Sequence, residues 1–150
     1  MEVNTTAVWH LAKLCGEHMV AQKSGAIVNV ASILGLVGST PIKQANYAAS
    51  KGAVINLTRE LALQWARKGV RVNAVCPGPV DTPMIEAVEL GQAGGDPEAL
   101  KALRAQRLAM VPDGRYASAR EVAQLIVYLA SDLSSHITGE GVHINGGQYS

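Results

Sequence analysis

The sequence predicts an α/β fold, in which a parallel β-sheet carries helices on both faces. Short strand-like segments occur at residues 25–32, 70–78 and 139–147, and longer segments with helical periodicity separate them. Strands that alternate with helices pair in parallel through right-handed crossovers. We therefore expect about three parallel strands in a single domain that covers residues 1–150.

The first predicted helix covers residues 3–22, because its apolar residues recur every three to four positions. The apolar, β-branched run that follows Gly25 is typical of a buried strand. Helical periodicity returns over residues 46–67, and Gly69 lies where this second helix is expected to end.

The second half of the chain carries clear start and stop signals. The strand at 70–78 is cut off by a Pro-Gly pair, and a polar, glycine-containing stretch follows it. Asp96 and Pro97 have the form of an N-cap and an N1 proline, which open a helix to about Met110. The sequence SARE at 118–121 matches a capping box, so another helix is predicted after it.

Composition excludes several classes of partner. The chain is 48% hydrophobic and 17% charged, as expected for a packed core, and its net charge is +1 without a run of Lys or Arg. We therefore expect no nucleic-acid partner. No apolar stretch reaches the roughly 20 residues of a membrane span, and we expect no membrane association. The first residues do not form a secretory signal, which favours a cytoplasmic location.

Cysteine and histidine spacing gives no sign of a metal site. Cys15 and Cys76 have no CxxC partner, and both are expected to be reduced thiols in the core. The histidines form no HxxxH pattern. We predict neither a disulfide nor a bound metal.

Polar residues gather where the first two strands end. Ligands of open α/β sheets bind at the carboxyl ends of the strands. Ser32 follows the first strand, and Pro77 and Gly78 follow the second. Tyr47 and Lys51 lie one helical turn apart at the start of the helix between these strands. All five residues are therefore expected to converge on one rim of the sheet.

Tyr47 and Lys51 have the chemistry of an acid/base pair. A phenol exchanges protons poorly near neutral pH, and a cation one turn away favours the phenolate. Ser32 is placed to hydrogen-bond a substrate oxygen near the phenol. The bare YxxxK pattern also arises by chance on helices, so the strand-end serine and the Pro-Gly turn are what favour a catalytic interpretation.

Several linked motifs resemble those of the C-terminal part of the short-chain dehydrogenase/reductase family, and together they span essentially the whole chain. IVNVAS resembles the family's strand that ends in the catalytic serine, which falls on Ser32. YAASK resembles its YxxxK helix, which falls on Tyr47 and Lys51. MEVN matches the segment whose asparagine completes the catalytic tetrad, so Asn4 takes that role.

Two more segments extend the resemblance. VNAVCPGPVDTPM resembles the strand and Pro-Gly turn that close over the nicotinamide, and its cofactor-binding positions fall on Pro77, Gly78, Val80 and Thr82. YLASDLSSHITGEGVHINGG resembles the family's closing helix, TG turn and last strand. The implied fold is the C-terminal half of a Rossmann-like, doubly wound parallel sheet with about three strands and flanking helices.

The resemblance implies an NAD- or NADP-dependent oxidoreductase with a small alcohol or carbonyl substrate. Tyr47 gives a proton to the carbonyl oxygen as hydride arrives, or removes one in the reverse direction, and Ser32 polarises that oxygen. Lys51 holds the nicotinamide ribose beside Tyr47. Asn4 positions a water that links Lys51 to solvent. The family commonly forms homo-oligomers through helices that match residues 4–22 and 46–67 and through the region of the last strand, and we expect a homo-oligomer here.

Three residues also have structural interpretations. Asn4 is equally well placed to cap the first helix, and Thr82 has the form of an ordinary N-cap. Asn73 is interpreted as a strand residue with a structural hydrogen bond and is not assigned to the site.

The chain departs from the family pattern in two ways. The spacing from Ser32 to Tyr47 is slightly longer than usual, which makes Ser39 a rival for the serine role; Ser32 is preferred because it ends the strand. The family's glycine-rich turn, which holds the cofactor pyrophosphate, has no counterpart, and neither do the residues that select NAD or NADP.

These departures leave three interpretations. The chain is a fragment or truncated form of an active oxidoreductase, a catalytically inactive homologue that acts as an assembly partner, or an α/β module for another small ligand. A glycine-rich βαβ coding stretch in frame upstream of Met1 would distinguish the first from the second.

Overall fold

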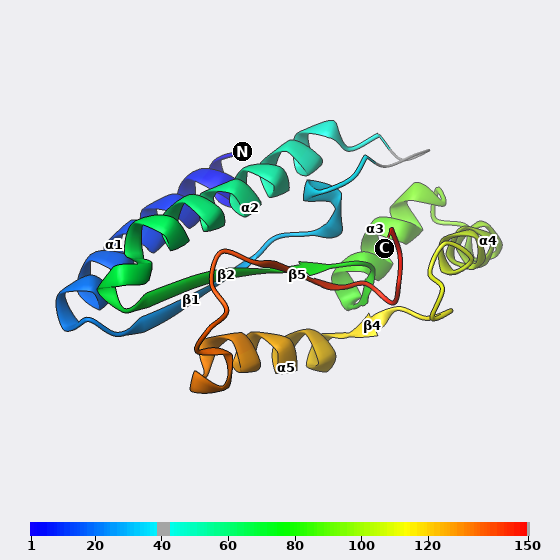
Figure 1. The fold of residues 1–150 in the computed structure, drawn as a ribbon. Helices are drawn as coiled ribbons and strands as arrows, with labels where there is room; N and C mark the ends of the chain where they lie inside the picture. The colour runs from blue at the N-terminus through cyan, green and yellow to red at the C-terminus, as the bar shows by residue number, and fades with distance from the viewer. Residues whose placement is uncertain (39–42, 150) are drawn as a thin grey trace.

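A three-stranded parallel sheet forms the middle layer of the molecule, with the strand order β1–β2–β5 (Figure 1). The computed structural model describes residues 1–38 and 43–149. The strands are β1 (Gly25–Val30), β2 (Val70–Pro77) and β5 (Gly141–Ile144). The predicted α/β class, the three strands and their parallel pairing are therefore confirmed.

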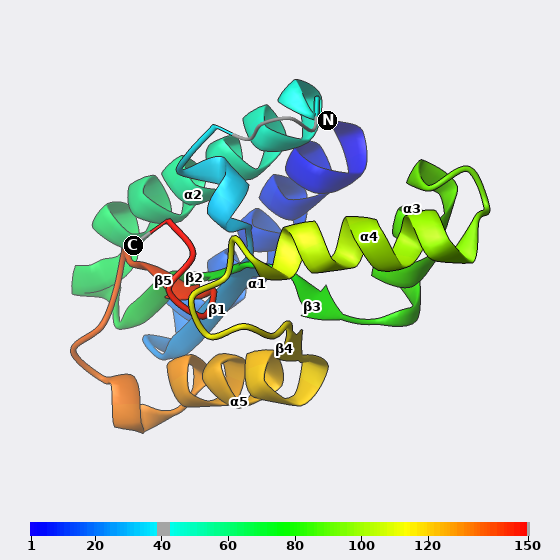
Figure 2. The same cartoon turned by 90° about the vertical axis from the view of Figure 1, so that its right-hand side faces the viewer.

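Helices cover both faces of this sheet (Figures 1 and 2). A π-helical turn, Glu2–Thr6, leads into α1 (Ala7–Gln22), which lies with α2 (Ala45–Trp65) on one face. The opposite face carries α5 (Ala119–Ala130). Short 3₁₀ turns cover Ile33–Gly35, Ala66–Lys68 and Asp132–Ser134.

Strand β2 is the centre of the core. It pairs with β1 on one side and with β5 on the other, and it is almost fully buried. Its one polar core residue, Asn73, is completely buried and has its amide satisfied. Asn73 donates to the carbonyl oxygen of Ile137 at 2.8 Å and accepts from the backbone nitrogen of Glu140 at 3.1 Å. These bonds confirm the structural interpretation of Asn73.

Helix α1 packs on α2 through small residues. The buried positions of α1 are Ala12 and Gly16, and a Cβ atom at Gly16 would lie 2.2 Å from the Trp65 ring. This narrow contact turns Cys15 away from the core and leaves it exposed, so the expectation of a core thiol is wrong for Cys15. Cys76 is buried in β2 as expected.

A second layer of structure stands at the carboxyl ends of the strands (Figure 2). It contains α3 (Pro83–Gln92) and α4 (Pro97–Leu108), and a two-stranded parallel ribbon joins β3 (Val80–Asp81) to β4 (Ala117–Ser118). The polar stretch after β2 thus contains a helix, α3, of which only the N-cap at Thr82 was expected from the sequence.

Both helices of this layer begin with side-chain caps. The Thr82 hydroxyl accepts from the backbone nitrogen of Ile85 at 3.3 Å, so Thr82 is an N-cap, as its structural interpretation holds. The Asp96 carboxylate accepts from the backbone nitrogen of Glu98 at 3.0 Å and begins α4 as predicted. None of the helices in the described part of the chain is long and apolar enough to cross a membrane.

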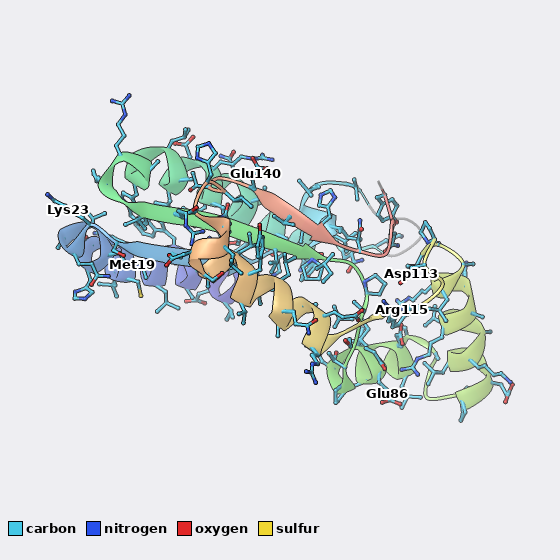
Figure 3. All side chains as sticks on the ribbon, turned by 60° about the horizontal axis from the view of Figure 1, so that its bottom comes forward. Met19, Lys23, Glu86, Asp113, Arg115 and Glu140 are labelled. Atoms are coloured by element: carbon cyan, nitrogen blue, oxygen red, sulfur yellow. The ribbon has the colours of Figure 1, made fainter. Side chains whose placement is uncertain are left out.

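The capping box predicted for α5 is present, and its glutamate also forms an ion pair with Arg115. Ser118 Oγ accepts from the backbone nitrogen of Glu121 at 3.2 Å, and Glu121 accepts from the backbone nitrogen of Ser118 at 2.7 Å. Arg115, seen beside Asp113 in Figure 3, pairs with Glu121 at 2.8 Å. The hydrogen bond from Arg115, and then those from Ser118, lower the pKa of Glu121 to about 2.

This depressed pKa gives the α5 cap a defined pH dependence. A carboxylate whose pKa is lower in the folded state stabilises the fold above its unfolded pKa, and the stabilisation is lost as the pH falls through the folded value. Replacing Glu121 with Gln should therefore lower the melting temperature near neutral pH. The gap to the wild type should shrink as the pH falls from about pH 5 to about pH 2 in thermal unfolding followed by circular dichroism.

The matched control is Glu17→Gln, which removes an exposed pair with Lys13 at 4.0 Å. This change should have little effect at any pH, because such pairs contribute little. A Glu121→Gln effect that is the same at neutral and acid pH would contradict the role of the ionised cap.

Candidate active site

A cavity of about 410 Å³ lies between the carboxyl ends of the strands and the α3–α4 layer. One wall consists of segments that follow β1, β2 and β5, together with the start of α2. The other wall comes from α3, from the end of α4 and from Tyr116. Ligands of open α/β sheets bind at this position, where strands end and their loops diverge.

Ser32 lies in the sheet-side wall, just beyond β1. The residue is extended and largely buried, and its Oγ accepts a hydrogen bond from the backbone nitrogen of Leu34 at 3.2 Å. This bond caps the Ile33–Gly35 turn and fixes the hydroxyl oxygen. The hydroxyl hydrogen is left available for a ligand.

Tyr47 and Lys51 occupy the first turns of α2. Tyr47 lines the cavity, and the Lys51 ammonium lies 5.6 Å from the centroid of the Tyr47 ring. Lys51 Nζ also donates to the carbonyl oxygen of Val30 at 2.9 Å, which ties α2 to the end of β1. Burial lowers the pKa of Lys51.

A close backbone contact holds these two segments together. A Cβ atom at Gly35 would lie 2.6 Å from the carbonyl carbon of Lys51 and 2.7 Å from the nitrogen of Gly52. A Cβ atom at Gly52 would in turn lie 3.2 Å from the carbonyl oxygen of Gly35. Only glycine at position 35 therefore allows the turn after Ser32 to reach α2.

Asn4, near the N-terminus, contacts helix α2 through Ser50. Its Nδ2 donates to Ser50 Oγ at 3.3 Å, and the neighbouring Thr5 hydroxyl donates to the Ser50 carbonyl oxygen at 3.3 Å. The N-cap of α1 is Thr6 and makes no side-chain cap bond. The alternative in which Asn4 caps the first helix is therefore wrong, since its side chain contacts the residue next to Lys51.

The Pro-Gly turn after β2 completes the sheet-side wall. Pro77 and Gly78 line the cavity, and Gly78 donates its backbone N–H to the carbonyl oxygen of Ile144 at 3.0 Å. A Cβ atom at Gly78 would lie 3.0 Å from Asn145 Cα, so the turn packs directly on the segment that follows β5.

The other residues expected at the site lie further away. Val80 belongs to β3 and Thr82 caps α3, and neither is among the residues that line the cavity. Ser39, the rival serine, lies outside the described residues. The described residues hold no group of three or more His, Cys, Asp or Glu side chains that could bind a metal ion.

The sequence patterns did not single out several polar residues that line the cavity, among them Glu89, Arg107, Tyr116 and Gln148. Glu89 had a detectable signal. Ile85, Val88, Glu89 and Gln92 recur at helical spacing on α3, and all four face the cavity. A carboxylate on such an apolar stripe indicates a buried ionic interaction.

Comparison with known proteins gives a consistent result. The family model described as enoyl-(acyl carrier protein) reductase matches residues 1–149. The 3-oxoacyl-[acyl-carrier-protein] reductase FabG of Vibrio cholerae is 40% identical over 149 residues, which are 99% of this chain and 56% of that protein. Dehydrogenase/reductase SDR family member 6 of Rattus norvegicus is 44% identical over 98% of this chain and 58% of its own.

Solved structures resemble the fold closely. Levodione reductase superposes with a TM-score of 0.89 at 35% identity, over 97% of this chain and 54% of the other. A putative 2-deoxy-D-gluconate 3-dehydrogenase from Agrobacterium tumefaciens, with bound NADP, superposes with a TM-score of 0.82 at 31% identity. The match covers 99% of this chain and 56% of the other. The chain spans about half the length of the curated relatives it matches.

The glycine contact next to Ser32 yields a first test of the site's construction. Gly35→Ala should destabilise the fold by about 1–3 kcal/mol, because the added methyl group overlaps the backbone of α2. It should also shift the amide resonances of Ser32 and Tyr47. Gly91→Ala on α3 is the control, because its Cβ position has no atom within 4 Å apart from its chain neighbours and the backbone of its own helix. Urea unfolding and two-dimensional NMR measure both effects, and equal stability of the two variants would contradict the contact.

Proposed function

The chain belongs to the short-chain dehydrogenase/reductase family, and on this premise we propose that it is the catalytic part of an NAD(P)-dependent oxidoreductase. The reaction is hydride transfer between a nicotinamide and a carbonyl or alcohol substrate. The observation that carries the proposal is the rim on which Ser32 and Tyr47 line one cavity, with the Lys51 ammonium beside the phenol.

Tyr47 is the proposed acid and base. In the direction of reduction, its phenol O–H bond breaks, and the proton goes to the oxygen of the substrate carbonyl as that group becomes an alcohol. The Lys51 ammonium, 5.6 Å from the ring centroid, stabilises the phenolate that remains. In oxidation, the same phenolate takes the proton from the alcohol.

Ser32 is the proposed orienting residue for the substrate oxygen. Its Oγ already accepts from Leu34, so its O–H points elsewhere and can donate to the reacting oxygen. Because Ser32 is largely buried, this hydrogen bond forms away from bulk water, where it is stronger.

Lys51 and the Pro-Gly turn are proposed to hold the cofactor, which supplies or takes up the hydride when bound. An ammonium group has three N–H donors, and the bond to Val30 uses one of them, which leaves two for ribose hydroxyls. Gln148 Oε1 is buried and has no hydrogen-bond partner in the described part of the chain. This acceptor lies in the wall beside Gly78 and fits an amide donor such as the nicotinamide carboxamide.

Three further assignments belong to the proposal. Asn4, bonded to Ser50, is proposed to hold a water beside Lys51, and Val80 and Thr82 are proposed to contact the cofactor from the turn before α3. The choice between NAD and NADP depends on residues outside these 150. We place the protein in the cytoplasm.

A homo-oligomer is proposed because apolar side chains remain exposed on the first two helices. They are Trp9, Leu11 and Leu14 on α1 and Leu63 on α2. Such a surface favours association with another apolar face. Nothing in the fold or the comparisons favours the inactive assembly partner over the oxidoreductase.

Loss of the phenol tests the proposed mechanism directly. Tyr47→Phe in the full-length protein should lower kcat by about 100-fold or more and leave cofactor affinity nearly unchanged, because only the proton donor is removed. Steady-state rates with NADH and NADPH, with a fluorescence titration of each cofactor, measure the two effects. Tyr128→Phe, an exposed tyrosine on α5, is the matched control. Turnover of the Tyr47 variant within a few-fold of the wild type would rule out the proposed role.

Cofactor affinity of the 150 residues by themselves is a separate prediction. We expect dissociation constants above about 1 mM for NAD(H) and NADP(H). A dinucleotide is held along its length, and the hydrogen bonds available here contribute about 1 kcal/mol each, whereas association costs about 4 kcal/mol or more. Isothermal titration calorimetry with parallel light scattering tests this. A micromolar affinity in a monodisperse sample would contradict it.

A further inference from the structure

The wall of the cavity opposite the sheet contains a completely buried carboxylate. The side chain of Glu89 on α3 has no exposed surface. Its Oε1 accepts from Arg107 Nη1 at 2.7 Å and from the Tyr116 hydroxyl at 2.7 Å. Its Oε2 accepts from Arg104 Nε at 2.8 Å. Burial by itself would raise the pKa of Glu89, but the hydrogen bonds from Tyr116, Arg104 and Arg107 lower it below its ordinary value, so the carboxylate is ionised.

This carboxylate balances the charge of the cavity. Glu89 and Arg107 are the charged residues among those that line it, and they are paired with each other. The side chain of Arg107 is only 12% exposed, whereas that of Arg104 is 34% exposed. The cluster has one carboxylate for two guanidinium groups. Arg104 is the more exposed of the two and does not line the cavity, so water and salt screen its charge more than that of Arg107.

The remainder of this wall is apolar. Met84, Ile85 and Val88 line it from α3, and Met110 lines it from beyond α4. An ionised ligand group in such a place loses its hydration and needs an opposite charge that is not already engaged. A neutral, largely apolar ligand incurs no such loss.

We propose that Glu89 determines the charge specificity of the site: by neutralising Arg107, it makes the cavity select neutral, largely apolar carbonyl or alcohol compounds over those with a carboxylate or phosphate at the end remote from the reacting carbon. Glu89 acts through Arg107 and is a specificity-determining residue that does not itself take part in the chemistry. This inference rests on the proposed function, because that function defines what a substrate of the site is. The binding measurements described below do not require turnover.

The isosteric change Glu89→Gln tests the inference. The amide keeps the volume and one carbonyl acceptor of the glutamate, but it leaves the charge of Arg107 uncompensated. The probes are 2-octanone and 7-oxooctanoate, which carry the same methyl ketone and differ in the terminal carboxylate. Values of kcat/KM for both probes, and their dissociation constants from ligand-observed NMR, are measured with the full-length wild type and each variant.

The wild type should prefer 2-octanone by roughly tenfold or more, and Glu89→Gln should reduce that ratio by roughly tenfold or more, through KM with little change in kcat. The double variant Glu89→Gln/Arg107→Gln should restore the neutral preference, because it removes the freed cation. Glu121→Gln, which breaks the exposed pair with Arg115, is the control and should leave the ratio unchanged.

If Glu89→Gln does not fold, Arg107→Gln carries the test. That variant leaves Glu89, still paired with Arg104, as the charged residue among those that line the cavity, and it should widen the preference for 2-octanone. A wild type that prefers the carboxylate, an unchanged ratio in folded Glu89→Gln, or no binding of either probe overturns the inference. If the protein binds 2-octanone more tightly than 7-oxooctanoate but turns over no carbonyl compound, the proposed function is overturned instead.

Discussion

The contact between Gly35 and the first turns of α2 is the constraint on which the candidate site depends. Ser32 comes from the end of a strand and Tyr47 from the start of a helix, and nothing in the local sequence brings the two together. The backbone of the turn reaches that of Lys51 and Gly52 so closely that a side chain on Gly35 would not fit. The bond from Lys51 to Val30 closes the same junction from the other side. Spacing within the site is thus set by backbone packing, which is stiffer than contacts between long side chains.

The sheet that supports this junction is unevenly buried. Central β2 is almost completely buried, whereas most of β1 is only half-buried and Val30 at its end is 50% exposed. Within the described residues, β1 pairs with β2 alone, so its other edge offers unpaired backbone groups. The same strand carries Ser32 at its end. A strand that paired with this edge would therefore lie next to the site, on the side of β1 opposite to β2.

Much of this fold was predictable because its signals are local. Buried strands, helix caps at Asp96 and Ser118, and the rim position of Ser32 follow from short patterns whose physical causes lie within a few residues. Cys15 was mispredicted because the side of a helix that packs closely is decided by its partner. Trp65 requires the small residue Gly16 opposite it, and the buried stripe of α1 turns accordingly.

The α3–α4 wall was the least predictable part, for a related reason. Its stability depends on a carboxylate, Glu89, whose hydrogen-bond partners lie on α4 and just before β4. The role of Glu89 can therefore be recognised only from the folded structure. The contact of Asn4 with Ser50, 46 positions away, is of the same kind. Long-range polar pairs leave no periodic signal, because each partner separately resembles an ordinary surface residue.

The two walls of the cavity are held in place by different physical interactions, so substitutions affect them differently. The sheet-side wall is held by backbone packing and strand register, so its groups keep their positions when surface residues change. The opposite wall lies between β3 and β4, which pair over two residues, and it contains a buried ionic cluster. Substitutions in that cluster can alter the charge and shape of the cavity without moving Ser32 or Tyr47. A site built in this way can retain one reaction while its substrate changes, which agrees with the different compounds named for its structural relatives.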